Sequence, residues 1–138
     1  MNRIDLQQPA DERILDAEAL LQAGRFSAAY YLCGYAIEFA LKARISKQVG
    51  LHDFPDRGLA QRSFSHDLVD LVELARLKLP LQLDSTPAPN ALSINWSIVK
   101  NWNERTRYEP KTEYEARRLF QAVTDNSSGV FPWIKTRW

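Results

Sequence analysis

The chain has 138 residues, 45% of them hydrophobic and 25% charged, and its formal net charge is +1 at pH 7. This length fits one domain that buries its own core, so we expect residues 1–138 to form a single domain. The balanced charge singles out no partner, and a single cysteine excludes an internal disulfide framework. There is no apolar run long enough to span a membrane and no signal peptide at the polar start of the chain, so we expect a cytoplasmic protein with no membrane partner.

Helical spacing dominates the hydrophobic pattern, whereas alternation typical of strands is scarce. Pro9 suits the first turn of a helix, and Ser65 can cap a helix that Pro80 would end. Thr112 and Glu115 form the spacing of a capping box. The sequence therefore predicts an all-α fold, a five- to six-helix up-and-down bundle with long connections at 50–65 and 80–91. The predicted helices cover residues 9–23, 25–49, 66–79, 93–103 and 112–124, with a short last turn at 130–135.

The segment 25–49 is predicted to be the central helix, because its apolar side chains cover nearly the whole circumference. Such a helix is either buried on several sides within the bundle or part of a dimer interface. Cys33 lies in the middle of this segment among apolar neighbours, which is typical of an inert packed thiol. Trp102 is in register with Ile98, so we expect it in the core.

Three segments together resemble the HEPN family. They are residues 23–43, the run Ser65-His66-Asp67-Leu68, and residues 102–110. The resemblance covers about residues 10–125 and leaves 126–138 as a C-terminal tail. The matching positions are Ala29, Ala36, Glu38, Leu41, Lys42, Ala43, Arg107 and Tyr108, with Glu109 inserted before Pro110.

The resemblance implies a helical bundle that commonly acts as a homodimer. Many members are metal-independent ribonucleases, often toxins paired with a nucleotidyltransferase antitoxin, and others bind nucleotides or serve as non-catalytic partners. The ribonucleases carry an arginine, four to six residues, and then a histidine. Here no histidine follows Arg105 or Arg107, while Arg62 and His66 enclose three residues, and Arg44 and His52 enclose seven. Without a histidine to carry the proton, this departure favours binding over cleavage.

Charged side chains in the matching segments are the candidate ligand-binding residues. Glu38 and Lys42 are spaced to pair on one helix, with Arg105 or Arg107 as a further partner, or else to contact a ligand directly. Arg105 and Arg107 lie on a short loop and could hold a phosphate. Arg107 could equally pair with Glu38.

Tyr108 and His66 each have two interpretations. Tyr108 could fill the core, or it could stack on a base or bond a phosphate. His66 could be a cap or surface histidine, or it could contact an anion at a helix start. The aromatic tail with Trp133 and Trp138 could pack back on the domain or cover a partner chain.

The leading hypothesis is therefore a homodimeric domain that binds a nucleotide, RNA or another phosphate-bearing ligand, as part of a toxin–antitoxin or defence pair. No catalytic residue and no cofactor is predicted. A metal site is not predicted either, because two histidines and one cysteine lack metal-site spacing. One alternative is an endoribonuclease with an atypical site that uses His66 and an arginine. Another is a non-catalytic interaction module for a nucleotidyltransferase partner.

Overall fold

The computed structural model describes residues 3–49 and 57–138, and in these residues it is all-helical, with no strand. The predicted all-α class is confirmed. Eight α-helices and one 3₁₀ helix are found in the described residues, more than the five or six expected. They are α1 (Arg3–Gln22), α2 (Phe26–Gln48), α3 (Arg57–Arg62), α4 (Leu68–Leu74), α5 (Lys78–Asp84), α6 (Ala91–Val99), η1 (Glu104–Tyr108), α7 (Glu113–Thr124) and α8 (Val130–Lys135).

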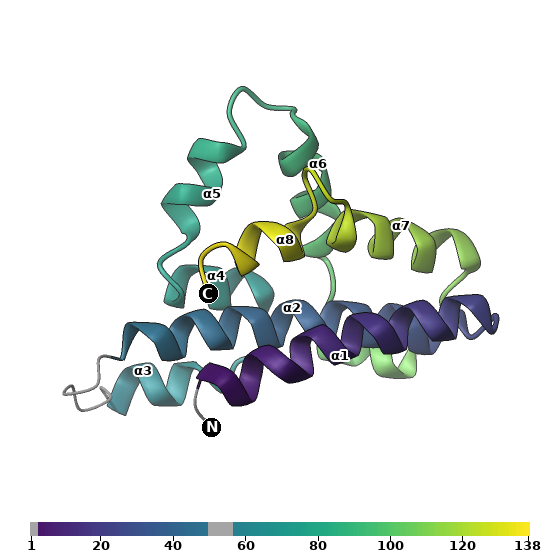
Figure 1. Cartoon of the computed structure of the whole chain (residues 1–138), viewed down its shortest axis with the longest axis horizontal. Helices are drawn as coiled ribbons and strands as arrows, with labels where there is room; N and C mark the ends of the chain where they lie inside the picture. The colour runs from purple at the N-terminus through teal and green to yellow at the C-terminus, as the bar shows by residue number, and fades with distance from the viewer. Residues whose placement is uncertain (1–2, 50–56) are drawn as a thin grey trace.

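The two longest helices, α1 and α2, lie side by side and form the base of the molecule (Figure 1). Helix α2 also contacts α4, α7, α8 and η1, so it is the central helix that the sequence predicted. Small side chains such as Ala36 and Ala40 are fully buried on it and let neighbouring helices approach closely. Its ends are nearly as predicted, at Phe26 and Gln48.

Helix α1 begins at Arg3, six residues before the predicted start. Pro9 lies inside the helix and cannot donate a backbone hydrogen bond there. The flanking residues Leu6 and Ala10 are buried, so packing of the first turns offsets the lost bond. At the other end Gly24 adopts a φ of +74° in the tight turn that leads into α2.

The single helix predicted at 66–79 is wrong, because the structure has two helices there. Asp67, and not Ser65, caps α4 by accepting a hydrogen bond from the Asp70 N–H. Arg76 then adopts a φ of +56°, and the N–H groups of Arg76 and Leu77 bond back to the end of α4 in a Schellman pattern. Pro80 lies in the first turn of α5, where its missing N–H costs nothing, so it helps to start a helix and does not end one. The predicted loop at 50–65 contains the short helix α3. The first part of that loop, residues 50–56, lies outside the described residues.

The later helices lie close to their predicted positions. Thr112 and Glu115 form the predicted capping box at the start of α7, and the last helix is α8. Helix α6 runs from Ala91 to Val99, earlier than the expected 93–103, because Asn90 caps it in a box with Ser93. Trp102 follows the helix and is buried in the core, as predicted.

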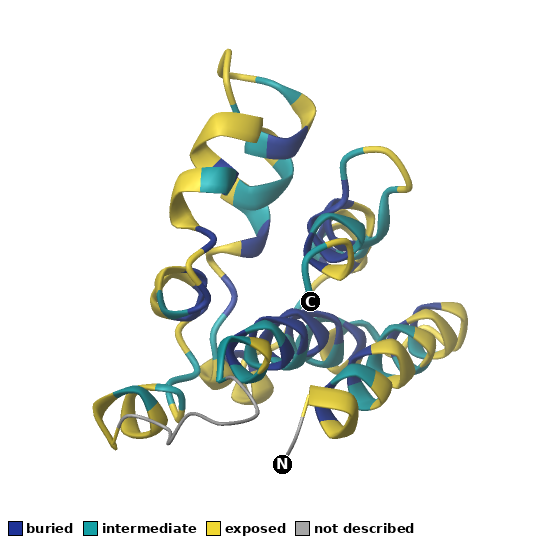
Figure 2. Cartoon of the chain, turned by 60° about the vertical axis from the view of Figure 1, so that its left-hand side comes forward, coloured by how far each residue is buried: buried dark blue, intermediate teal, exposed yellow. Residues whose placement is uncertain are grey.

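The C-terminal tail packs back on the domain, as one of the two interpretations of its tryptophans expects. Trp133 and Trp138 pack against the buried core. Trp133 Nε1 donates to Asp84 Oδ2 at 2.8 Å, and Arg137 pairs with the same carboxylate at 2.9 Å. The tail thereby ties α8 to α5, which stands with α6 above the α1–α2 base (Figures 1 and 2). Within the described residues, none of the helices combines the length and the apolar character that crossing a bilayer requires.

Candidate functional site

Glu38 is a carboxylate buried within the central helix, with a side chain only 2% exposed. Its Oε1 forms an ion pair with Lys42 Nζ at 2.9 Å and a hydrogen bond with His66 Nδ1 at 2.5 Å. The predicted pairing of Glu38 with Lys42 is therefore confirmed. The expected additional arginine is replaced by His66, because the loop before α4 brings that ring onto α2.

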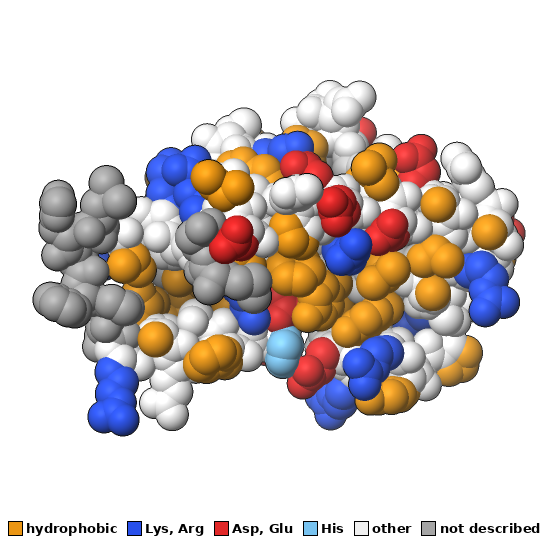
Figure 3. Space-filling view, turned by 60° about the horizontal axis from the view of Figure 1, so that its bottom comes forward, with side chains coloured by type: hydrophobic (Ala, Val, Ile, Leu, Met, Phe, Trp, Pro, Cys, Tyr) orange, Lys and Arg blue, Asp and Glu red, His pale blue; other side chains and the backbone are white. Residues whose placement is uncertain are grey.

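His66 joins three parts of the fold. Its Nδ1 bonds Glu38, and its Nε2 lies 3.3 Å from Oε2 of Glu104, the first residue of η1. It does not cap α4, and its side chain is 40% exposed, so it lies at the surface but is held between two carboxylates. Sequence reasoning missed Glu104, because nothing in the local pattern of η1 indicates a contact with a residue 38 positions earlier. On the face seen in Figure 3, hydrophobic side chains gather beside the histidine.

An aromatic group lies on α2 one turn from Glu38. Trp102 is 1% exposed and packs over Gly34, where a Cβ atom would come within 2.2 Å of the indole ring. The rings of Tyr31, Tyr35 and Phe39 follow one another along the outer side of α2, with centroid separations of 5.6 and 4.7 Å. These three rings are only partly buried, so α2 keeps an aromatic strip on its outer side.

The cations of η1 point outward. Arg107 donates a hydrogen bond to the Tyr108 hydroxyl, and this bond raises the pKa of the guanidinium. Tyr108 is 76% exposed, so the expectation that it fills the core is wrong. Arg107 does not pair with Glu38, and Arg105 is exposed as well. The reason is that Thr106 is the buried residue of this short turn, so its neighbours on both sides face solvent.

A hollow of about 670 Å³ lies between the start of α2 and the segment after η1. We call it the cationic hollow, because its lining includes three cations, Arg25, Arg107 and Lys111, and no carboxylate. Among the described residues no ion pair is found for Arg25 or Arg107, whereas Lys111 lies 3.4 Å from Glu109 and 3.6 Å from Glu115. The other lining residues are Gly24, Phe26, Ser27, Ala28, Tyr31 and Leu32.

The first turn of α2 opens into the cationic hollow. Arg25 occupies the N-cap position without a side-chain cap hydrogen bond, and the turn contains no acidic residue. The leading N–H groups of this 23-residue helix are thus not satisfied by a cap, and they add the positive end of the helix dipole to the hollow. Partial burial lowers the pKa of Lys111, but Tyr30, Glu109 and Glu115 more than offset this and raise it, so the ammonium stays charged.

Sequence reasoning placed one of the three cations, Arg107, among the candidates and missed Arg25 and Lys111. The structure separates its six candidates into two groups. Glu38, Lys42 and His66 form a network around the buried Glu38 carboxylate, whereas Arg105, Arg107 and Tyr108 are exposed on η1. The missed signal was an N-terminal turn of a long helix without a capping side chain or an acid.

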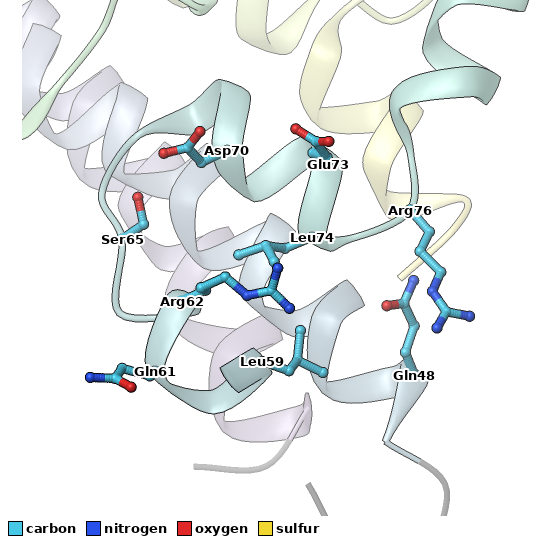
Figure 4. Close-up of a pocket in the computed structure, with 9 residues that line it drawn as sticks. All are labelled: Gln48, Leu59, Gln61, Arg62, Ser65, Asp70, Glu73, Leu74 and Arg76. Carbon is cyan, nitrogen blue, oxygen red and sulfur yellow. The ribbon is translucent and has the colours of Figure 1, made fainter. Parts of the chain in front are cut away.

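A second hollow, of about 770 Å³, lies between α3, α4 and the end of α2 (Figure 4). Its lining includes Arg62 and Arg76 but also Asp70 and Glu73, so we call it the mixed-charge hollow. In Figure 4 the two carboxylates lie on α4, and Arg62 reaches in from α3. Opposite charges of equal number give it no preference for an anion.

Comparison with protein-family models, with curated proteins and with solved structures finds no match. The case for a function therefore depends on the geometry of the site and on the resemblance of its sequence segments. Within the described part of the chain, no group of three or more histidine, cysteine or acidic side chains is arranged to hold a metal ion. Cys33 is fully buried, and burial raises the pKa of its thiol, which suits a packed side chain.

Proposed function

We propose that this chain is a HEPN-type domain that binds a phosphate-bearing ligand, a nucleotide or RNA, in the cationic hollow. One observation carries the proposal: an uncapped helix N-terminus opens into a hollow lined by three cations and no carboxylate. Backbone N–H groups at a helix start and nearby guanidinium groups are the donors that phosphate oxygens prefer.

The remaining lining supports a nucleotide in particular. A hollow of about 670 Å³ lies within the range that small-molecule and cofactor ligands occupy. The partly exposed ring of Tyr31 lines the same hollow and offers a face on which a base can stack. Arg105 and Tyr108, on the exposed side of η1, extend the surface along which a longer RNA would run.

In this proposal Glu38, Lys42 and His66 position the site and do not contact the ligand. His66 fastens η1 to α2 through Glu104 and Glu38, and η1 carries Arg107. Loss of His66 is therefore expected to weaken binding by loosening η1.

Calorimetric titration of ATP, GTP and a short RNA tests the proposal. Arg107→Ala should weaken binding about tenfold, since one charge-assisted contact is removed. Arg62→Ala is the matched control, because it removes the same charge from the mixed-charge hollow and should leave the affinity unchanged. Absence of heat with all three ligands at high protein concentration would contradict the proposal. An equal loss of affinity in Arg107→Ala and Arg62→Ala would contradict it as well.

We also propose a homodimer, as the family resemblance implies. Beyond Tyr31, which lines the cationic hollow, the partly buried rings of Tyr35 and Phe39 leave part of α2 uncovered by its own chain, which supports an interface there. Light scattering coupled to gel filtration should give twice the chain mass, and Phe39→Glu should give the single mass.

A nucleotidyltransferase partner in a toxin–antitoxin or defence pair follows from the resemblance alone, and co-purification with a tagged chain from its native host tests it.

A second candidate function is RNA cleavage, which one contact favours. The buried Glu38 carboxylate holds Nδ1 of His66, which orients the imidazole, and proton transfer at Nε2 would require Glu104, 3.3 Å away, to yield that nitrogen to the RNA. Incubation of mixed RNA with the protein and EDTA would reveal metal-independent cleavage. If His66→Ala cleaves as fast as the wild type, this candidate fails.

A further inference from the structure

Both ring nitrogens of His66 face carboxylate oxygens, one from each side. Nδ1 lies 2.5 Å from Glu38 Oε1, and Nε2 lies 3.3 Å from Glu104 Oε2. We call these three residues the histidine clasp. An ionised carboxylate only accepts hydrogen bonds, and a neutral imidazole carries one N–H, whereas an imidazolium carries two. Both contacts are therefore favourable together only when the ring is protonated, because a neutral ring presents a lone pair to one of the carboxylates.

The charges around this ring balance only in its protonated state. Glu38 and Lys42 face it from α2, and Glu104 faces it from η1. Asp67 is engaged at the N-cap of α4. Burial raises the pKa of the nearby Tyr35 hydroxyl, and Glu38 and Glu104 raise it further, so this group stays uncharged near neutral pH. Among the described residues one ammonium thus accompanies two carboxylates, and the imidazolium supplies the second positive charge.

The two carboxylates of the clasp differ in burial, which determines the contact that loss of the proton releases. The side chain of Glu38 is 2% exposed, so it cannot exchange the ring for water, whereas the side chain of Glu104 is 55% exposed. Glu104 also makes the longer of the two contacts, so it is the group that separates. Histidine ordinarily changes its charge between about pH 5 and 8, which places such a release near neutral pH.

A released Glu104 carboxylate has a cation within reach on its own helix. Side chains three residues apart stand on the same side of a 3₁₀ helix, which puts Glu104 beside Arg107. Beyond the effect of burial, Glu104 raises and Arg107 lowers the pKa of the Tyr35 hydroxyl, so both charges lie near the same group. Arg107 lines the cationic hollow, where its guanidinium donates a hydrogen bond to the Tyr108 hydroxyl.

We propose that the histidine clasp makes phosphate binding in the cationic hollow dependent on the protonation of His66. In the protonated state the clasp holds Glu104 against α2 and leaves Arg107 to the ligand. In the neutral state Glu104 pairs with Arg107 and takes one of the three cations from the hollow. The hollow therefore binds phosphate more tightly below neutral pH than above it. The effect on the ligand rests on the proposed function, whereas the clasp itself does not.

Calorimetric titration of a short RNA without terminal phosphates, at about pH 6 and about pH 8 and constant salt, tests the regulation. Phosphodiester groups keep their charge over this range, whereas a terminal phosphate titrates near pH 6. The affinity should be about threefold to tenfold lower at the higher pH, since complete removal of Arg107 is expected to cost about tenfold.

Three variants identify the groups responsible. Glu104→Gln should bind at the higher pH as tightly as the wild type does at the lower pH, because the competing carboxylate is gone. Arg107→Ala should bind with an affinity that does not depend on pH. His52→Gln removes the other histidine of the sequence and is the matched control, which should retain the dependence.

Spectra of the free ¹⁵N-labelled protein test the clasp without any ligand. From about pH 5 to 8, the signals of Arg107 should shift with the same midpoint as the His66 ring, and in Glu104→Gln they should not. The proposal is overturned if the Arg107 signals do not follow His66, or if RNA binds equally tightly at both pH values. Absence of RNA binding at both pH values would overturn the proposed function and the regulation with it, and the Arg107 signals would then show whether the clasp itself operates.

Discussion

Replacing Gly34 with alanine places a methyl group directly against the buried indole of Trp102. An ideal Cβ at residue 34 would lie 2.2 Å from two indole carbons and 2.4 Å from a third. Carbon atoms normally approach to about 3.5–4.0 Å, so the ring or the helix must move by roughly 1.5 Å. Trp102 is 1% exposed, so its ring lies in the core and cannot turn out to solvent without leaving its packing.

Two effects of opposite sign decide the stability of Gly34→Ala. Alanine gains about 1 kcal/mol over glycine within a helix, whereas overpacking a core costs about 1–3 kcal/mol and occasionally more. Because the clash involves a helix backbone and a fully buried ring, we expect the second effect to win. The free energy of unfolding should fall by up to about 2 kcal/mol.

Urea denaturation followed by circular dichroism measures this change. The same substitution in a Trp102→Leu background is the control, because the clash is absent there and alanine should stabilise the helix by up to about 1 kcal/mol. If Gly34→Ala stabilises the protein that retains Trp102, the packing described for these two residues is incorrect.

Three further changes test other parts of the structure. Glu38→Ala should lower the free energy of unfolding by about 3 kcal/mol, because it leaves an unfilled space in the core and removes the carboxylate that holds His66. A loss below about 1 kcal/mol in urea denaturation would contradict the contacts described for Glu38, Lys42 and His66. Arg76→Gly should raise stability by about 1 kcal/mol, because glycine relieves the left-handed backbone, whereas Arg76→Ala should not. Hydrogen bonds from Thr112 lower the pKa of Glu115 below its ordinary 4.5. Glu115 therefore contributes stability above pH 4.5 that is lost as the pH falls through its folded pKa, and Glu115→Gln should remove this loss in urea titrations at a series of pH values.

The parts of the fold that follow from local sequence were predictable. The near-continuous apolar surface of residues 25–49 indicated the central helix, and the spacing of Thr112 and Glu115 indicated the start of α7. The register of Trp102 with Ile98 indicated its burial. Each of these signals lies within a few residues of the feature that it predicts.

The break between α4 and α5 could not be predicted, because Arg76 occupies a left-handed position where glycine is the usual signal. Pro80 is compatible with both the end of one helix and the start of another, so it does not decide between them.

The candidate site was only partly predictable because it is assembled from distant segments. Arg25 and Lys111 are brought together by the contacts of α2 with η1 and α7, and His66 meets Glu38 across 28 positions. The resemblance of the sequence segments marked Arg107 as a candidate, but it contained no information on which cations share a hollow.

Mapping the bound ligand on the protein is the most direct test of the central claim, that the cationic hollow holds a phosphate-bearing ligand. On titration of the ¹⁵N-labelled chain with ATP, the largest shifts should occur at the amides of Ser27 and Ala28 in the uncapped turn of α2 and at Lys111. Added salt should weaken the effect, since phosphate contacts are screened. Shifts confined to the mixed-charge hollow around Arg62 and Arg76, or no shifts at all, would contradict the claim.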